Sequence, residues 1–101
     1  MAVYAVTEVK FDAGNQRVLQ VKMGPVIVKD KEWMSAPMIV DVAEVVKAIK
    51  LGDDVFTMFQ RRGHPVPGPK LKVTTHSNGR EGVMIDGPET PLMTLKDLPT
   101  F

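Results

Sequence analysis

The chain has 101 residues and no cysteine, and its 13 basic and 12 acidic side chains almost balance. A chain of this length predicts one domain, spanning residues 1–101. The lack of cysteine excludes disulfide scaffolds, thiolate metal sites and cysteine nucleophiles. No basic stretch precedes the apolar start, and no apolar run approaches the roughly 18 residues that span a membrane. We therefore expect a cytoplasmic protein without a membrane partner.

The first third of the chain predicts an antiparallel hairpin. Residues 3–11 are rich in strand-forming side chains, and residues 17–23 alternate between apolar and polar. Gly24 and Pro25 should interrupt the second strand, after which residues 26–28 begin a third strand or a bent continuation. Pro37 restricts any strand around it to a sheet edge.

Residues 41–52 predict the helix of the fold. Asp41 and Glu44 have the spacing of a capping box, and Gly52 suits the left-handed conformation that closes a helix. Lys47 and Lys50 fall away from the apolar stripe and should be solvated. The stripe that should face the core consists of Val42, Val45, Val46 and Ile49.

The second half predicts three more strands, at residues 55–59, 70–76 and 82–86. A loop at 61–69 contains three prolines and should be extended. Asn-Gly at 78–79 is a strong hairpin signal. The expected fold class is α+β, an antiparallel sheet of about five strands with one packed helix, in the order β-β-(β)-α-β-β-β. Three side chains near the end should pack on the core: Leu95, Leu98 and Phe101.

Candidate catalytic and metal-ligating residues are few. His64 and His76 are the only histidines, too few for a zinc site at regular spacing. Turn chemistry accounts for the acids around the strand ends, so we assign no catalytic residue, metal or cofactor. A small hydrolase-like enzyme stays as the alternative, with a site assembled from Asp54, His76 and Asp86.

Charge is distributed unevenly along the chain. Residues 55–80 contain five basic side chains and no acid. A solvated face is the favoured interpretation, and a weak, non-specific nucleic-acid surface is the alternative, with Phe59 or His64 stacking on bases. The candidate binding surface consists of Arg61, Arg62, His64, Lys70, Lys72 and Arg80.

The second half of the chain resembles a family of short bacterial proteins of unknown function. The similar positions are Val45, Ala48, Ile49, Gly52 and Phe56, followed by the Asn78-Gly79 hairpin and the ending Leu95-Lys96-Asp97-Leu98-Pro99-Thr100-Phe101. The resemblance implies a bacterial source and a compact α+β fold, and it implies no residue roles.

The leading hypothesis is a small non-enzymatic binding or accessory domain. Its partner is undetermined: a protein is one candidate, and nucleic acid is less favoured. The sequence also leaves open whether Trp33 belongs to the core or to an interface. A monomer is slightly favoured over a homodimer that pairs through residues 26–28.

Overall fold

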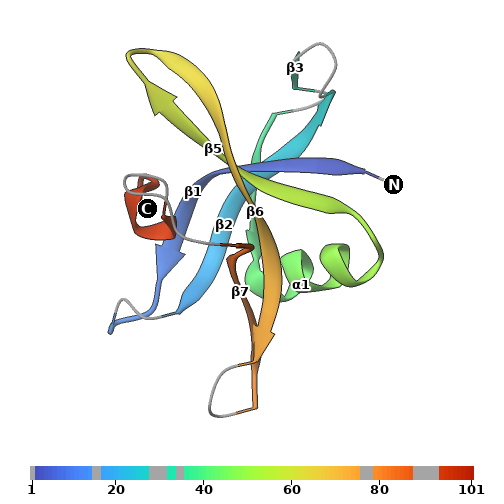
Figure 1. Ribbon diagram of the computed structural model, residues 1–101. Helices are drawn as coiled ribbons and strands as arrows, with labels where there is room; N and C mark the ends of the chain where they lie inside the picture. Colours follow the sequence, from blue (N-terminus) through green and yellow to red (C-terminus); the bar gives the residue numbers. More distant parts are fainter. Residues whose placement is uncertain (1, 15–16, 28–31, 34–35, 76–78, 88–93) are drawn as a thin grey trace.

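A twisted sheet with one α-helix packed against it forms the protein, as the computed structural model in Figure 1 shows. The structure describes residues 2–14, 17–27, 32–33, 36–75, 79–87 and 94–101. This part confirms the α+β class. Its elements are β1 (Val3–Phe11), β2 (Val18–Ile27), β3 (Glu32–Trp33), β4 (Met38–Asp41), α1 (Val42–Lys50), β5 (Asp54–Arg61), β6 (His64–Thr75), β7 (Glu81–Ile85) and the 3-10 turn η1 (Leu95–Asp97).

The sheet is mixed, so the prediction of a purely antiparallel sheet of about five strands is wrong in this detail. The strand order is β3-β2-β1-β5-β6-β7, and β4 also pairs with β2. β1 and β5 are parallel, from the pair Val3 and Asp54 to the pair Val6 and Thr57. β4 is antiparallel to β2, and β2 is antiparallel to β1. β4 and β5 therefore run in the same direction, and α1 connects them. A helix is the usual connection between parallel strands.

β2 continues through Gly24 and Pro25, so the predicted interruption there is wrong. Val26 and Ile27 continue β2, which was one of the two alternatives for residues 26–28. Both Gly24 and Pro25 stay paired with β1. On its other edge β2 carries β4 at residues 20–23 and β3 at residues 26–27. Pro25 lies between these two partners, where the sheet needs no backbone N–H from it.

The expected loop at 61–69 is a β-hairpin. Arg62 and Gly63 both have positive φ, at 52° and 80°, as the tight turn of a two-residue hairpin requires. β6 starts at His64, opposite Arg61, and Pro65 and Pro67 pair opposite Gln60 and Met58. Because the two prolines are two residues apart, their backbone nitrogens face the same edge of β6. No described strand pairs with β6 along that edge.

The predicted hairpin after β6 is confirmed by pairing between β6 and β7, from Leu71–Ile85 to Thr75–Glu81. Its tip at 76–78, including His76, lies outside the described residues. The long β6 therefore pairs with β5 through its first part and with β7 through its second part. In Figure 1 the two hairpins extend toward opposite ends of the molecule.

The helix begins after Asp41, as predicted, but the capping box does not form. Asp41 makes no side-chain cap, because its Oδ1 accepts a hydrogen bond from Gln20 Nε2 of β2 at 3.0 Å. At the other end Gly52 has a φ of 95°, which confirms its expected role in closing the helix.

The core lies between α1 and one face of the sheet. Leu98 is buried and Leu95 packs beside it, as expected, whereas Phe101 is 42% exposed and the expectation for it is wrong. The side chain of Trp33 lies outside the described part of the chain. The main buried cluster consists of Val6, Val9, Val18, Val21, Met23, Val45, Val46, Val55, Phe59, Leu71, Val83, Ile85 and Leu98.

Candidate functional site

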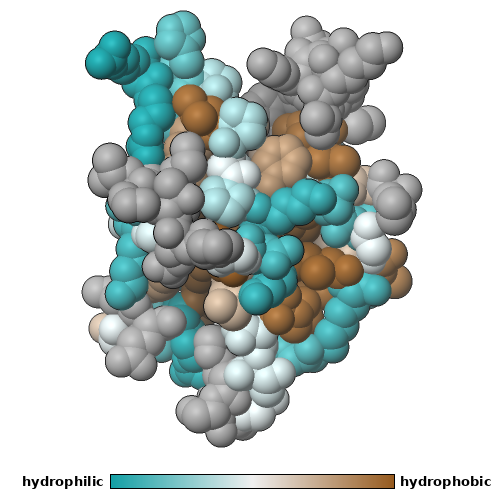
Figure 2. Space-filling model, viewed as in Figure 1, coloured by the Kyte–Doolittle hydropathy of each residue, from teal (hydrophilic) through white to brown (hydrophobic). Residues whose placement is uncertain are grey.

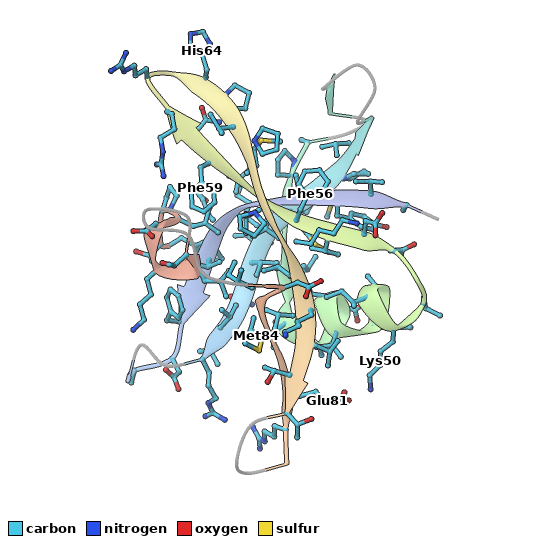
Figure 3. All side chains as sticks on the ribbon, viewed as in Figure 1. Lys50, Phe56, Phe59, His64, Glu81 and Met84 are labelled. Atoms are coloured by element: carbon cyan, nitrogen blue, oxygen red, sulfur yellow. The ribbon has the colours of Figure 1, made fainter. Side chains whose placement is uncertain are left out.

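The residues of the predicted basic surface are spread along β6 and its two hairpins. His64 lies at the far end of the β5–β6 hairpin, and Glu81, next to Arg80, lies toward the opposite end of the molecule (Figure 3). β6 has 12 residues and would span about 36 Å if straight, at roughly 3.3 Å per residue. Lys70 sits in between and pairs with Asp54, with an Nζ–Oδ1 distance of 3.4 Å. The structure thus spreads these cations along β6 and does not bring them together in one place.

At the β5–β6 end, Phe59, one of the two side chains expected to stack on nucleic-acid bases, is not accessible. Phe59 is 1% exposed, and the guanidinium of Arg61 lies 5.2 Å from the centre of its ring. Arg61 also contributes to the field that lowers the pKa of Asp97, after the hydrogen bonds from the Thr94 backbone N–H and hydroxyl. Arg61 therefore interacts with groups of its own chain, and Arg62 and His64 are the exposed members of this group.

The alternative enzyme site is described only in part, because His76 lies outside the described residues. Asp54 and Asp86 both adjoin Lys70: Asp54 through the ion pair, and Asp86 through its backbone N–H, which donates to the Lys70 carbonyl at 2.8 Å. Both carboxylates occur at strand ends. Among the residues that the structure describes, no group of three metal-ligating side chains forms a metal site.

A groove with an apolar floor lies between α1 and the start of β7. We call it the α1–β7 groove. It is open to solvent, and its volume is about 580 Å³. Figure 2 shows apolar side chains gathered over the part of the surface where Figure 1 places α1, with polar ones beside them. The lining residues are Val42, Ala43, Val46, Lys47, Lys50, Leu51, Arg80 and Glu81.

The helical side of the groove is built from two adjacent rows of side chains four residues apart. One row is Val42, Val46 and Lys50, and the other is Ala43, Lys47 and Leu51. Rows with this spacing form the ridges into which a second helix packs. Leu51, at the end of one row, is 71% exposed, so a large apolar side chain stands open at the end of the helix.

Cations dominate the rim of the groove. Among the described residues, the lining includes the basic side chains of Lys47, Lys50 and Arg80 and the carboxylate of Glu81, while the acidic residue of α1, Glu44, is not part of it. Lys50 and Glu81 form an ion pair across the groove, with an Nζ–Oε1 distance of 2.6 Å, and Figure 3 shows them side by side. Among the described lining residues, basic side chains therefore outnumber acidic ones.

Sequence reasoning missed this groove because it assigned Lys47 and Lys50 to a solvated side of the helix. A signal was present: Ala43, Ala48 and Leu51 widen the apolar surface beyond the predicted stripe. A helix that is apolar over more than one face has more surface than a single core contact covers. The second wall, at Arg80 and Glu81, depends on where a distant hairpin folds, and no local pattern fixes that.

No family model matches this chain, and no curated protein or solved structure is significantly similar to it. The resemblance to short bacterial proteins therefore stays a prediction. No helix in the described part of the chain has the length and apolar character needed to cross a membrane.

Proposed function

We propose that this protein is a non-enzymatic binding or accessory domain and that it binds its partner in the α1–β7 groove. The observation that carries the proposal is the combination of an apolar floor with an excess of basic over acidic side chains among the described lining residues. Apolar contact supplies affinity and the charges select the partner, as in binding surfaces generally.

The alternatives have less support. A nucleic-acid surface needs its cations together, and here they are spread along β6 and the hairpins at its two ends. An enzyme needs positioned acid and base groups. The two carboxylates of the alternative site, Asp54 and Asp86, are both at strand ends, and Asp54 forms an exposed ion pair with Lys70. The groove, in contrast, combines apolar area with an excess of basic side chains among its described lining residues.

Two measurements test the proposal together. A screen of small organic fragments, peptides and oligonucleotides followed by amide chemical shifts should give changes that cluster at residues 42–51 and 79–82. A panel of hydrolase substrates should show no turnover. Ligand shifts confined to the β5–β6 hairpin would contradict the choice of groove. Turnover that is lost in Asp54→Asn or Asp86→Asn, with the fold intact, would contradict the binding role.

A further inference from the structure

We propose that the outer edge of β4 binds an extended segment of a partner protein, which adds a strand to the sheet there. β4 takes no part in lining the α1–β7 groove, so this surface goes beyond the proposed function. Three observations lead to it: an edge without a described neighbour, the apolar side chains that this edge exposes, and the contrast with the open edge of β6.

β4 has a described strand on one side only. It is antiparallel to β2 over its whole length, from Met38 opposite Met23 to Asp41 opposite Gln20. The described part of the sheet has no strand on the other side of β4. Because the backbone groups of successive residues point to opposite sides of a strand, two of its four residues direct their N–H and C=O groups toward that side. A second extended backbone is the partner that pairs with such a row of donors and acceptors.

The edge also exposes two large apolar side chains. Met38 is 68% exposed and Ile39 is 55% exposed, more than any other large apolar side chain of the described strands. As neighbours in a strand, they point to opposite faces of the sheet. A strand beside β4 would therefore cover part of Met38 on one face and part of Ile39 on the other, through cross-strand pairs. Apolar contact thus accompanies the backbone hydrogen bonds on both faces.

The open edge of β6 is built differently. There Pro65 and Pro67 lack the N–H that pairing requires, and both are exposed. Proteins commonly block open edges with proline or with lysine. β4 contains neither, because its sequence is Met-Ile-Val-Asp and Pro37 only precedes it. Of these two open edges, β4 is the one that can accept a strand.

A second copy of this chain does not fit the edge. β4 is about 13 Å long, and a ladder of four residues buries far less than the roughly 800 Å² per partner of a stable dimer. A symmetric antiparallel pair would also place Asp41 of one copy beside Met38 of the other, so that a carboxylate meets an apolar side chain. A segment of a different protein is free of that mismatch, because its own sequence can match β4.

Asp41 gives the partner segment a charge preference. Its Oδ1 accepts a hydrogen bond from Gln20 Nε2 at 3.0 Å, and the residue is exposed, so the carboxylate keeps acceptor capacity for a cation. A basic residue opposite Asp41 is therefore favoured, with apolar residues opposite Ile39 and Met38. In the antiparallel arrangement, the partner segment reads basic, any residue, apolar, apolar.

Four peptides of eight residues, tested on the unmodified protein, probe the edge. The first contains Lys-Thr-Ile-Val at its centre, and the second has the same composition in scrambled order. The other two are forms of the first with N-methyl groups on alternate backbone nitrogens, one at the odd and one at the even positions. N-methylation removes the N–H groups from one edge of a strand, so only one form keeps the edge that pairs with β4. Amide chemical shifts report binding.

The first peptide should shift the signals of residues 38–41, with a Kd of about 1 mM or below, as expected for a small contact. Amide exchange of two alternate residues in β4 should slow when it is bound. One N-methylated form should bind within about threefold of the first peptide, and the other at least about tenfold more weakly. The scrambled peptide should bind at least about fivefold more weakly.

Substitutions locate the contact. Met38→Thr should weaken the first peptide by about three- to tenfold, because it removes apolar area and keeps a strand-forming residue. Met84→Thr is the matched control: Met84 is a 42% exposed methionine of β7 (Figure 3), and its replacement should change binding less than about twofold. Asp41→Asn should weaken the first peptide by about two- to fivefold and leave a version with Gln in place of Lys unchanged.

Several results would overturn the proposal. They are the absence of shifts at residues 38–41 with millimolar peptide, equal weakening by both N-methylation patterns, equal binding of the scrambled peptide, and equal effects of Met38→Thr and Met84→Thr. Shifts at residues 43–51 and 79–82 in place of 38–41 would remove the β4 edge as a site and leave the α1–β7 groove of the proposed function standing.

Discussion

Gly68 packs where no other residue fits, although its φ is not in the left-handed region. A Cβ atom there would overlap Thr57 Oγ1 and lie 2.5 Å from Cε2 of the Phe59 ring. Thr57 and Phe59 are both buried, and Thr57 Oγ1 donates to the Pro69 carbonyl at 3.0 Å. Gly68→Ala should therefore lower the free energy of unfolding by about 3 kcal/mol, at the upper end for overpacking.

Gly63→Ala is the matched control for this prediction. Gly63 has a φ of 80° and no atom within 4 Å of the added Cβ, so only the backbone conformation is penalised. That penalty is about 1 kcal/mol. Urea unfolding of both variants tests the prediction. If the two substitutions lowered the free energy of unfolding equally, Gly68 would not be confined by its neighbours.

Asp97 should make the stability of the chain end depend on pH. Its pKa lies below the ordinary 3.8, chiefly because the backbone N–H and hydroxyl of Thr94 donate to its Oδ2, at 3.0 and 2.7 Å. A lowered pKa in the folded state contributes stability that is present above the unfolded pKa. This contribution is lost as the pH falls through the folded-state value.

The stability difference between the native chain and Asp97→Asn should thus be constant near neutral pH and shrink on acidification below about pH 4. Urea unfolding across the acid range measures it. Thr94→Ala, which keeps the backbone donor and removes the hydroxyl, should raise the Asp97 pKa part of the way in an NMR titration. A stability difference that does not vary with pH would contradict the assignment.

At the scale of the element, the prolines of β6 protect an open edge. Pro65 and Pro67 are both exposed, and no described strand pairs with that side of β6. Residues without an N–H cannot extend a sheet to another chain, so proline blocks edge pairing. Replacing both with Thr should increase self-association in sedimentation velocity, whereas replacing both with Lys should not, because charge also deters pairing. Equal behaviour of the two variants would contradict this role.

The elements whose structure follows from neighbouring residues were predictable. β1, the helix with Gly52 at its end, and the β6–β7 hairpin follow from alternation, spacing and turn residues. β6 was missed at its start because prolines usually interrupt strands, and only the position of the edge makes Pro65 and Pro67 acceptable. The parallel pairing of β1 with β5 was missed because it joins residues about 50 positions apart, which no local pattern encodes.

The candidate site was less predictable than the fold. Grouping residues 55–80 by charge ignored that an extended strand separates them, so Arg62 and Arg80 occur on opposite hairpins. The groove combines one helix with a turn about 30 residues later, and its cations were each ordinary surface residues in the sequence. Charge clusters become sites only when the fold brings them together.

At the scale of the whole molecule, we expect a monomer. The apolar residues Val26 and Ile27, which suggested a dimer edge, already pair with β3. β4 is an edge strand of four residues, too short to be a strong template for a second copy. Sedimentation velocity from micromolar to near-millimolar concentration should show one species of unchanged mass. A dimer that dissociates on dilution would contradict this expectation.

The last segment of the chain closes the sheet on β1. β1 pairs with β5 only through residues 3–6, and beyond them Val9 pairs with the chain end. The Val9 N–H donates to the Pro99 carbonyl at 3.0 Å, and the Phe101 N–H donates to the Val9 carbonyl at 3.2 Å. Leu98, 2% exposed, completes the buried cluster beside them. The end of the chain therefore replaces β5 as the neighbour of β1.

Deleting residues 95–101 should lower the free energy of unfolding by more than Leu98→Ala, which alone should cost about 2–4 kcal/mol as a large-to-small core change. The deletion also removes the two backbone hydrogen bonds to Val9, worth about 1 kcal/mol each. Because domains are stable by only about 5–15 kcal/mol, the truncated chain should be partly unfolded at 37 °C. Phe101→Ala, at an exposed side chain, is the control and should cost less than about 1 kcal/mol. If urea unfolding gave the deletion and Phe101→Ala the same midpoint, the chain end would be a surface appendage, and β1 would be held by β2 and β5 alone.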